Sequence, residues 1–392
     1  MDDAESALEV ATPNESELEE RRYGPCWRTR LKAAAESTPE GAAVALASLP
    51  SELVAHLESP ELTFASLMAG VGGRSSAYRL DDARWQGVAV EMHKPFVAVH
   101  AHNAPDIPVH RHYMRRDDPL PAIILNDRRP LTHLSAGPPC QPYSRAGKGE
   151  GADDQRDGIP AVIAAALRLR PLVVEVENVP EVQKHPQVVG TLRSQLERAG
   201  YWVEEAVLNA ADYGVPQRRR RYFMVASLLG PIPWPPPTTR GAPVTVEQAI
   251  GSSTKFNAFN SYYPKLELTA KQRERAEKLD ILSRCVNFRE LHPHLPARTL
   301  TSSNLGNKHA LMLRLRLSDG HTLRLPTLGE ASRLQTLPED FVFPAELISE
   351  RQAYLAIGNA MPTELARQLT QAARWAIGRR VGTTSGAAKS PH

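Results

Sequence analysis

Cysteine is scarce in this sequence of 392 residues, which contains only Cys26, Cys140 and Cys285. An odd number of widely separated cysteines does not build a disulfide framework, and zinc sites need paired spacings that are missing here. We therefore expect no metal site and a reducing, cytoplasmic compartment of bacterial type. A cysteine in such a protein is a buried structural residue or a reactive one, and its surroundings decide which.

Long hydrophobic runs and a strong net charge are missing as well. Arg168 and Arg170 interrupt the apolar stretches Ala161–Leu169 and Pro171–Val176, so no membrane-spanning helix is expected. The N-terminus begins with acids and lacks the basic-then-apolar pattern of a signal peptide. A net charge of +3 is too small to indicate a polyanionic partner by itself, so the position of the basic residues matters more. The densest basic cluster is Arg218–Arg221.

From Leu62 onward, short apolar runs alternate with helical segments. The strand candidates are Leu62–Met68, Gly87–Glu91, His133–Ala136, Leu172–Glu177, Trp202–Asn209 and Arg221–Ala226, and the helix candidates are Val162–Leu169 and Val189–Ala199. This alternation predicts an α/β fold with a Rossmann-like, doubly wound, mostly parallel sheet. Ligand sites in such sheets lie beyond the carboxyl ends of the strands. Met68-Ala69-Gly70, Pro139-Cys140 and Glu177-Asn178 each fall at such an end.

The sequence divides into a main domain, a smaller domain and two terminal segments. Residues 61–230 and 326–378 carry the α/β pattern and the apolar helices. Residues 1–60 have helical spacing and are interpreted as a packing or solubilising extension, which could also hold a protein partner. Residues 379–392 are expected to be a disordered tail.

Residues 231–325 lose the α/β rhythm and are interpreted as a second, smaller domain. The segment begins with the proline-dense stretch Pro231–Pro243, which is typical of a linker. A charged helix is expected at Thr269–Leu279. A hairpin is expected at Leu311–Arg324, with its turn at Asp319-Gly320.

The segment Gly137–Ser144 holds one cysteine among three prolines. Pro138, Pro139 and Pro142 forbid a regular strand or helix there and stiffen the loop, which preserves an attack geometry. The alternative, Cys140 as a small buried apolar residue, fits this surrounding poorly. We therefore interpret Cys140 as a nucleophile.

From about Leu62 to Arg374 the sequence resembles the DNA (cytosine-5) methyltransferases. The segments that carry the resemblance, in the order of the family's motifs, are Ala69–Gly73, Glu91, Gly137–Ser144, Asp154 with Arg156, Glu177-Asn178-Val179, Ala211–Arg221, Thr327–Pro338 and Gly358–Pro362. A single glycine loop is weak support, whereas this ordered set is specific. The resemblance implies the methyltransferase fold for the main domain and target recognition for the small domain.

The resemblance also implies the reaction. A methyl group passes from S-adenosylmethionine to C5 of a flipped-out cytosine in double-stranded DNA, through a covalent bond between Cys140 and C6. Glu177 is expected at N3 of the base. Arg219 and Arg221 share strand parity and are expected near its O2, whereas Arg218 and Arg220 are interpreted as surface or phosphate-facing residues. The alternatives are a strand-end carboxylate paired with a local cation, and a solvated arginine run.

Two further sets of residues follow from the resemblance. The expected cofactor-binding residues are Met68, Ala69, Gly70, Val71, Gly72, Gly73, Glu91, Met92, Pro139, Asn359 and Ala360. The expected nucleic-acid-binding residues are Gln141, Ser144, Arg145, Arg156, Asn178 and Gln217. In the small domain, suitable base or phosphate contacts include Arg298, Ser302, Ser303 and Asn304, although these residues are equally ordinary in loops.

Several positions depart from the family's pattern. Ser66 and Met68 replace the usual Asp and Phe before the glycine loop, and Tyr113 stands where an adenine-binding Asp is expected. A phenol is a weaker acceptor than a carboxylate, so weaker cofactor binding is expected. Glu175 places a second acid in a strand predicted to be buried, which requires a cationic partner or an exposed edge.

Three interpretations follow. The first is a sequence-specific DNA cytosine-5 methyltransferase of a restriction-modification or related defence system. The second is a nucleic-acid-binding homologue with weak or partner-dependent activity. The third is an RNA cytosine-5 methyltransferase.

Overall fold

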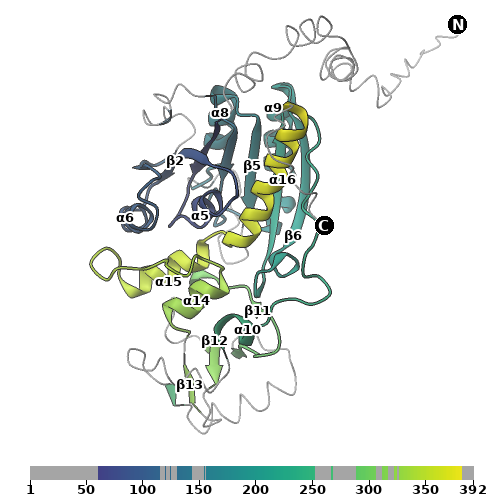
Figure 1. The fold of residues 1–392 in the computed structure, drawn as a ribbon. Coiled ribbons are helices and arrows are strands. Elements are labelled where there is room, and N and C mark those ends of the chain that lie inside the picture. Colours follow the sequence, from purple (N-terminus) through teal and green to yellow (C-terminus); the bar gives the residue numbers. More distant parts are fainter. Residues whose placement is uncertain are drawn as a thin grey trace, which may run out of the picture.

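The computed structural model describes residues 61–114, 120, 124, 130–143, 154, 156–251, 266–267, 288–305, 311–316, 322–324 and 326–381. The expected N-terminal extension and the expected charged helix at Thr269–Leu279 lie outside these residues. The described part contains one large sheet covered by helices and, at one end, a group of short strands and helices (Figure 1).

The large sheet has seven strands in the order β3-β2-β1-β4-β5-β8-β6. In that order they are β3 Val109–Arg111, β2 Trp85–Glu91, β1 Leu62–Leu67, β4 His133–Ala136, β5 Val173–Asn178, β8 Arg220–Ser227 and β6 Trp202–Asn209. Every pairing among the first five strands is parallel, whereas β8 runs antiparallel to both of its neighbours. The predicted mostly parallel, doubly wound sheet is therefore confirmed.

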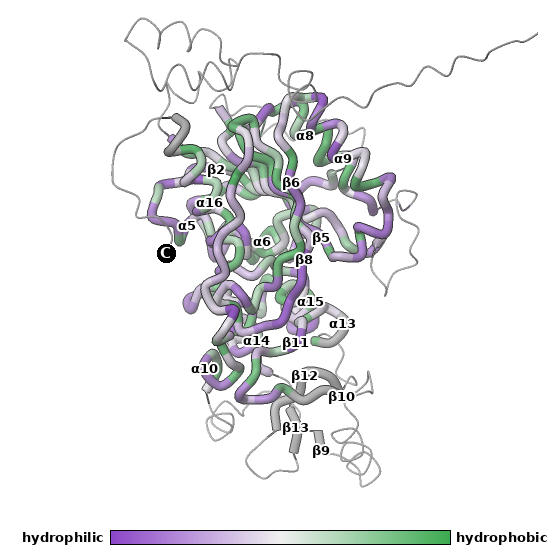
Figure 2. Tube along the Cα trace, turned by 90° about the vertical axis from the view of Figure 1, so that its right-hand side faces the viewer, coloured by the Kyte–Doolittle hydropathy of each residue, from purple (hydrophilic) through white to green (hydrophobic). Residues whose placement is uncertain are grey.

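Helices cover both faces of this sheet. They are α5 Gly73–Arg79, α6 Lys94–Asn103, α8 Ile159–Leu169, α9 Pro186–Arg198 and α16 Thr363–Val381, with short 3-10 helices at Pro180–Lys184 and Ala210–Tyr213. Figure 2 shows α8 and α9 on one side of the central strands and α5 and α16 on the other. Because α16 continues to Val381, the prediction that a disordered tail begins at residue 379 is wrong: the helix includes residues 379–381.

Burial explains why the strands are continuous apolar runs. Both faces of a sheet covered by helices are removed from water, so the inner strands have no polar face. The sequence of β5 is VVEVEN, and only Glu177 among its residues is not fully buried. The apolar sides of α8 and α9 close the core through residues such as Val162, Leu192 and Leu196, which are at most 2% exposed.

The remaining elements gather below the large sheet. They are β7 Gln217–Arg218, α10 Val246–Ile250, β9 Leu266–Glu267, β10 Phe288–Glu290, β11 Ala297–Arg298, α13 Ser302–Leu305, β12 Leu311–Arg316, β13 Thr322–Arg324, α14 Leu328–Leu334 and α15 Glu350–Asn359. A four-stranded sheet has the order β10-β12-β13-β9, and β11 pairs in parallel with β7. The antiparallel pair β12–β13 confirms the expected hairpin, whose turn lies outside the described residues.

The lower group and the C-terminal helices share one hydrophobic core. Val246 and Leu300, from the expected small domain, are fully buried in the same cluster as Leu334 of α14 and Ile357 of α15. Val71 of the glycine loop belongs to this cluster as well. The expected domain boundary at residue 325 is thus crossed by continuous apolar packing, which joins the lower group to the glycine loop.

Candidate active site

The carboxyl ends of the central parallel strands meet at one edge of the large sheet. The amide of Ala69 donates to the carbonyl of Val90 over 2.9 Å, and the amide of Gly137 donates to the carbonyl of Leu67 over 3.2 Å. These bonds join the segments that leave β1, β2 and β4. Because β5 pairs in parallel with β4, the residue sets expected at the ends of β1, β4 and β5 lie along a common rim.

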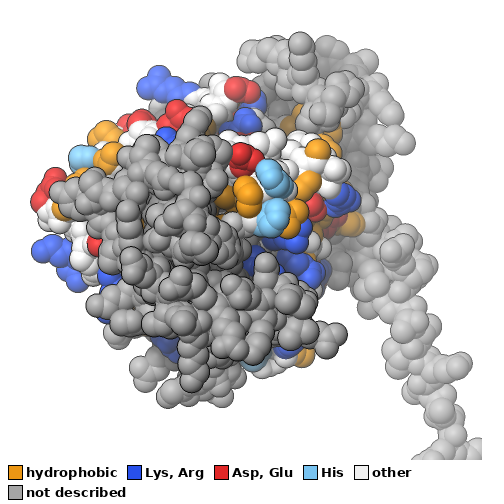
Figure 3. All heavy atoms as spheres, turned by 90° about the horizontal axis from the view of Figure 1, so that it is seen from below, with side chains coloured by type: hydrophobic (Ala, Val, Ile, Leu, Met, Phe, Trp, Pro, Cys, Tyr) orange, Lys and Arg blue, Asp and Glu red, His pale blue; other side chains and the backbone are white. Residues whose placement is uncertain are grey.

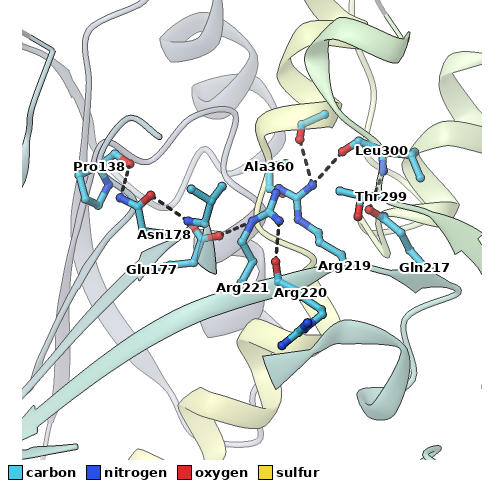
Figure 4. Close-up of polar contacts among 12 residues, drawn as sticks. Pro138, Glu177, Asn178, Gln217, Arg219, Arg220, Arg221, Thr299, Leu300 and Ala360 are labelled. Atoms are coloured by element: carbon cyan, nitrogen blue, oxygen red, sulfur yellow. Dashed lines mark hydrogen bonds and ion pairs between the residues drawn. The ribbon is translucent and has the colours of Figure 1, made fainter. Parts of the chain in front are cut away.

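Cys140 lies in a turn just past β4. Its carbonyl accepts from the amide of Tyr143 over 3.0 Å. The side-chain amide of Asn178 donates to the carbonyl of Pro138 over 3.4 Å, which links the cysteine loop to the end of β5 (Figure 4). Cys140 is half-buried. The loop thus holds the thiol at the rim without enclosing it.

Glu177 and Arg221 form an ion pair beside this loop. Arg221 comes from β8, the antiparallel neighbour of β5, and its Nε lies 2.8 Å from Oε1 of Glu177 (Figure 4). The side chains are 12% and 21% exposed for Arg221 and Glu177, so both can meet a ligand. This ion pair fits the alternative interpretation of Glu177 as a strand-end carboxylate that pairs with a local cation. It also presents a carboxyl group and a guanidinium together at the rim.

The surroundings of Cys140 shift the pKa of its thiol in opposite directions. Burial raises the pKa of the thiol, and the carboxylate of Glu177 raises it further, while the charges of Arg221 and Arg219 lower it. The net effect is a pKa above the ordinary value. Because only the thiolate is a good nucleophile, the cysteine is held largely protonated at neutral pH in this state.

Arg219 does not lie at the rim with Arg221. It is 2% exposed, and its guanidinium donates to the carbonyls of Leu300 at 2.8 Å, Gly358 at 3.1 Å and Ala360 at 3.2 Å. Burial, followed by the like charge of Arg221, lowers its pKa to about 9. The two arginines predicted to act together are therefore in different surroundings, and contact of Arg219 with a base would require these three hydrogen bonds to break.

The other two arginines of the run, Arg218 and Arg220, are exposed. This placement confirms the expectation that they are surface residues.

The glycine loop has the geometry of a ligand cradle. Gly70 and Gly72 have positive φ values of 59° and 101°, which favour glycine, and a Cβ built on Gly70 meets nothing within 4 Å. The Glu91 carboxylate accepts from the amide of Gly70 over 2.9 Å and from the amides of Met92 and His93 over 2.9 and 2.8 Å. Oε1 accepts from both Met92 and His93, so Oε2, which accepts from Gly70 alone, is the oxygen that keeps a lone pair for a further donor.

The other expected cofactor residues surround this loop. Met92 is 39% exposed beside Glu91 and offers an apolar surface. A Cβ built on Gly73 would lie 2.4 Å from the carbonyl oxygen of Met361, so the segment that carries Asn359 and Ala360 lies directly against the loop. Open space above Gly70, spare acceptor capacity on Glu91 and an apolar neighbour fit the amino-acid, ribose and adenine parts of S-adenosylmethionine.

The expected nucleic-acid-binding residues are not all on the surface. Gln217 is fully buried: its Nε2 donates to Gln335 over 2.6 Å, and its Oε1 accepts from the amide of Leu300 over 2.8 Å. Asn178 is 2% exposed. These two residues therefore lie inside the protein in this arrangement.

Of the remaining candidates in this set, Arg156 is half-exposed and forms a bidentate pair with Asp154 at 2.9 and 2.6 Å. Gln141 is half-buried in the cysteine turn. Ser144 and Arg145 lie outside the described residues.

A buried polar cluster lies behind the site, and the sequence predicted only part of it. Glu175 has the cationic partner that its buried strand requires: the guanidinium of Arg74, which also donates to the carbonyl of Ala366 over 2.9 Å. The hydroxyl of Tyr78 and Nδ1 of His133 are 3.0 Å apart in the same region. The acid in an apolar strand was a readable signal, but Arg74 follows a glycine loop and could not be identified as its partner from the sequence.

Two kinds of feature are absent from the described residues. No helix among them is both long and apolar enough to cross a membrane. Within the same part of the chain, no three His, Cys, Asp or Glu side chains come together as a metal site.

The fold and the rim define an α/β protein of the methyltransferase type with a cysteine, a carboxylate and an arginine at the strand ends. Solved structures agree on the fold. A methyltransferase of Entamoeba histolytica aligns with a TM-score of 0.60 at 16% identity, over 80% of this chain and 98% of that one. A DNMT2 mutant of Spodoptera frugiperda aligns with a TM-score of 0.61 at 18% identity, over 80% and 100%.

Sequence comparison adds the family. The model for C-5 cytosine-specific DNA methylases matches residues 62–375. The Type II methyltransferase M.AplI of Arthrospira platensis is 33% identical over 322 residues, which is 81% of this chain and 87% of the relative. The Type II methyltransferase M1.HphI of Haemophilus parahaemolyticus is 29% identical over 79% of this chain and 86% of its own. The chain therefore belongs to the C-5 cytosine-specific DNA methylase family, and it is a methyltransferase.

Proposed function

We propose that this protein methylates C5 of cytosine in double-stranded DNA, with Cys140 as the nucleophile. The observation that carries the proposal is the meeting of Cys140, Glu177 and Arg221 at one rim beside the glycine loop. The thiol supplies the electron pair, the carboxyl group can hold a proton, and the guanidinium can stabilise a carbonyl oxygen. Together they match what attack on a pyrimidine requires.

The reaction begins with proton loss from the Cys140 thiol to solvent. The sulfur then bonds to C6 of the cytosine, the C5–C6 double bond opens, and negative charge moves toward N3 and O2. Glu177 donates a proton to N3, and Arg221 binds O2. After methyl transfer, loss of the C5 proton to solvent restores the double bond and expels the Cys140 thiolate, and the N3 proton returns to Glu177.

S-adenosylmethionine, when bound, supplies the electrophilic methyl group for C5. Gly70, Gly72 and Glu91 would hold it: the open space above Gly70 would admit its amino-acid part, and Oε2 of Glu91 would accept from a ribose hydroxyl. Met92 offers an apolar surface to the adenine. The cytosine must leave the helical stack to reach this rim, at a cost of a few kcal/mol.

Membership of the DNA methylase family supports double-stranded DNA as the substrate. Seen from below, Lys and Arg side chains lie at several separate places on the surface of the described residues (Figure 3). Such charges contact phosphates without reading sequence. The relatives are Type II methyltransferases, which supports a sequence-specific role in a restriction-modification system.

Covalent trapping tests the proposal. Genomic DNA amplified with 5-fluorodeoxycytidine triphosphate offers every short sequence with a fluorine at C5, which cannot leave as a proton. With S-adenosylmethionine present, the protein should form a denaturation-resistant adduct that mass spectrometry locates at Cys140. If no adduct forms at that residue, the covalent mechanism is wrong.

Two controls complete this test. Cys140→Ser should form no adduct yet retain DNA binding in a gel-shift assay. Tritiated methyl transfer to unmethylated genomic DNA and to transfer RNA, measured in parallel, identifies the substrate. Label found only in RNA would overturn the choice of DNA.

A further inference from the structure

The buried guanidinium of Arg219 is held by backbone carbonyls. Among the described residues no carboxylate forms an ion pair with it, although the charge of Glu177 acts on it from a greater distance, and its three acceptors are all backbone carbonyls. Gly358 and Ala360 lie at the C-terminal end of α15, where helix carbonyls lack intrahelical donors and favour a cation. The third acceptor, Leu300, belongs to the segment between β11 and α13. One guanidinium therefore bridges two parts of the chain (Figure 4).

The same two parts also touch backbone to backbone. A Cβ built on Gly358 would lie 2.3 Å from the amide nitrogen of Ser302 and 2.4 Å from the carbonyl carbon of Thr301. Only glycine permits this approach. The end of α15 thus cannot stay in place if the segment at residues 300–302 moves toward it. Asn359 and Ala360, the expected cofactor contacts, come immediately after that point.

The segment is fastened to the strand that precedes Arg219. Ala297 and Arg298 of β11 pair with Gln217 and Arg218 of β7 in a short parallel ribbon. The hydroxyl of Thr299 donates to the carbonyl of Arg218 over 2.8 Å. Arg218 and Arg298 are register partners and both are exposed, so the ribbon presents two neighbouring guanidinium groups on the surface.

We propose that Arg219 is a positioning residue that couples phosphate contact at the ribbon of β7 and β11 to the cofactor pocket at Asn359-Ala360. This inference rests on the proposed function, since it requires both DNA and S-adenosylmethionine to bind. Phosphates held by Arg218 and Arg298 fix the ribbon and hence the Leu300 carbonyl. The planar guanidinium of Arg219 has a rigid donor geometry, so the position of the Leu300 carbonyl constrains the positions of the Gly358 and Ala360 carbonyls.

The inference predicts a measurable coupling between the two ligands. Calorimetric titration of S-adenosylhomocysteine into the full chain, with and without short fragments of unmethylated genomic DNA, gives the ratio of the two dissociation constants. For the wild type we expect DNA to tighten binding about tenfold, within the usual range of such couplings. In Arg219→Met the ratio should fall below about twofold. By reciprocity, the ratio of DNA affinities with and without S-adenosylhomocysteine should fall equally.

Arg351→Met is the matched control, because it removes the same group from an exposed position at the other end of α15. It should retain the wild-type ratio. Thr299→Val serves if Arg219→Met does not fold, since it deletes the hydrogen bond from the Thr299 hydroxyl to the carbonyl of Arg218, and its ratio should fall from about tenfold to about threefold.

The outcomes separate the two proposals. A wild-type chain that binds no S-adenosylhomocysteine would defeat the proposed function. A wild type in which DNA leaves the affinity unchanged, or a folded Arg219→Met or Thr299→Val with the full ratio, would overturn the coupling alone.

Discussion

The Nε atom of Arg221 lies 2.8 Å from Oε1 of Glu177, across the junction of the antiparallel strand β8 with the parallel strand β5. This contact holds the carboxyl group at the rim beside Cys140. A base that binds the guanidinium would therefore meet the Glu177 carboxyl group beside it.

Replacement of Glu177 by glutamine should slow the chemical step more than substrate binding. The amide keeps the shape of the side chain but cannot donate a carboxyl proton to N3, and such proton transfers contribute about 10²- to 10⁴-fold. Single-turnover methyl transfer with the pre-bound variant measures this step. Glu339→Gln, at an exposed position, is the control. An unchanged single-turnover rate in Glu177→Gln would clear Glu177 of this role.

Alkylation of Cys140 should accelerate steeply with pH. Burial and Glu177 hold the thiol pKa above its ordinary value, so below that pKa each unit of pH multiplies the thiolate fraction about tenfold. Iodoacetamide labelling, followed by peptide mass spectrometry, reports Cys140 separately from the other cysteines. In Arg221→Met the rate at pH 8 should fall, because a charge that lowers the pKa is lost. A rate that levels off below pH 8 in the wild type contradicts the raised pKa.

The buried pair of Arg74 and Glu175 should be costly to break and nearly neutral to replace. Arg74→Met leaves an uncompensated buried carboxylate and should lower the free energy of unfolding by about 3–5 kcal/mol. Arg74→Met combined with Glu175→Leu should recover most of that loss. Urea denaturation of the single and double variants measures the coupling.

The surface residue Arg193 gives the matched comparison for this pair. Its side chain is 35% exposed and pairs with Glu197 and Glu205. Arg193→Met should therefore cost about 1 kcal/mol or less. A loss of that small size in Arg74→Met would show that the buried pair does not behave as a desolvated one.

His100 should make the protein less stable in acid. It is fully buried beneath Gly72, and burial lowers its pKa from 6.5 to about 4. Between those values the unfolded chain binds more protons than the folded one, so stability is lost as pH falls from about 6.5 to about 4. The full difference corresponds to about 3 kcal/mol.

Urea denaturation at pH 7 and at pH 4 measures this loss. In His100→Leu the loss between the two pH values should be smaller than in the wild type by about that amount. His133, whose pKa is also lowered by burial, leaves part of the acid sensitivity in place. His102→Leu, on the exposed side of the same helix, should behave as the wild type. Equal acid sensitivity in His100→Leu and the wild type would contradict the assignment.

Most strands were predictable because they are short, largely apolar runs, which indicate strands of a sheet that helices cover. His133–Ala136 and Trp202–Asn209 have the bounds that the pattern indicates. Strand β3 was missed because Val109–Arg111 is short and mostly polar. The antiparallel direction of β8 could not be predicted, since direction depends on how the preceding chain returns to the sheet.

The sequence alone determined the fold class and the segments that come to the rim, because apolar periodicity and motif order are local properties. The ordered motifs also predicted Cys140 and Glu177 as candidate site residues. Only the tertiary structure separated Arg219 from Arg221. Strand parity places both on one side, but Arg219 lies between β7 and β8, where the carbonyls of α15 and Leu300 enclose it. Those acceptors lie 81 to 141 residues away along the chain, so no local pattern could reveal them.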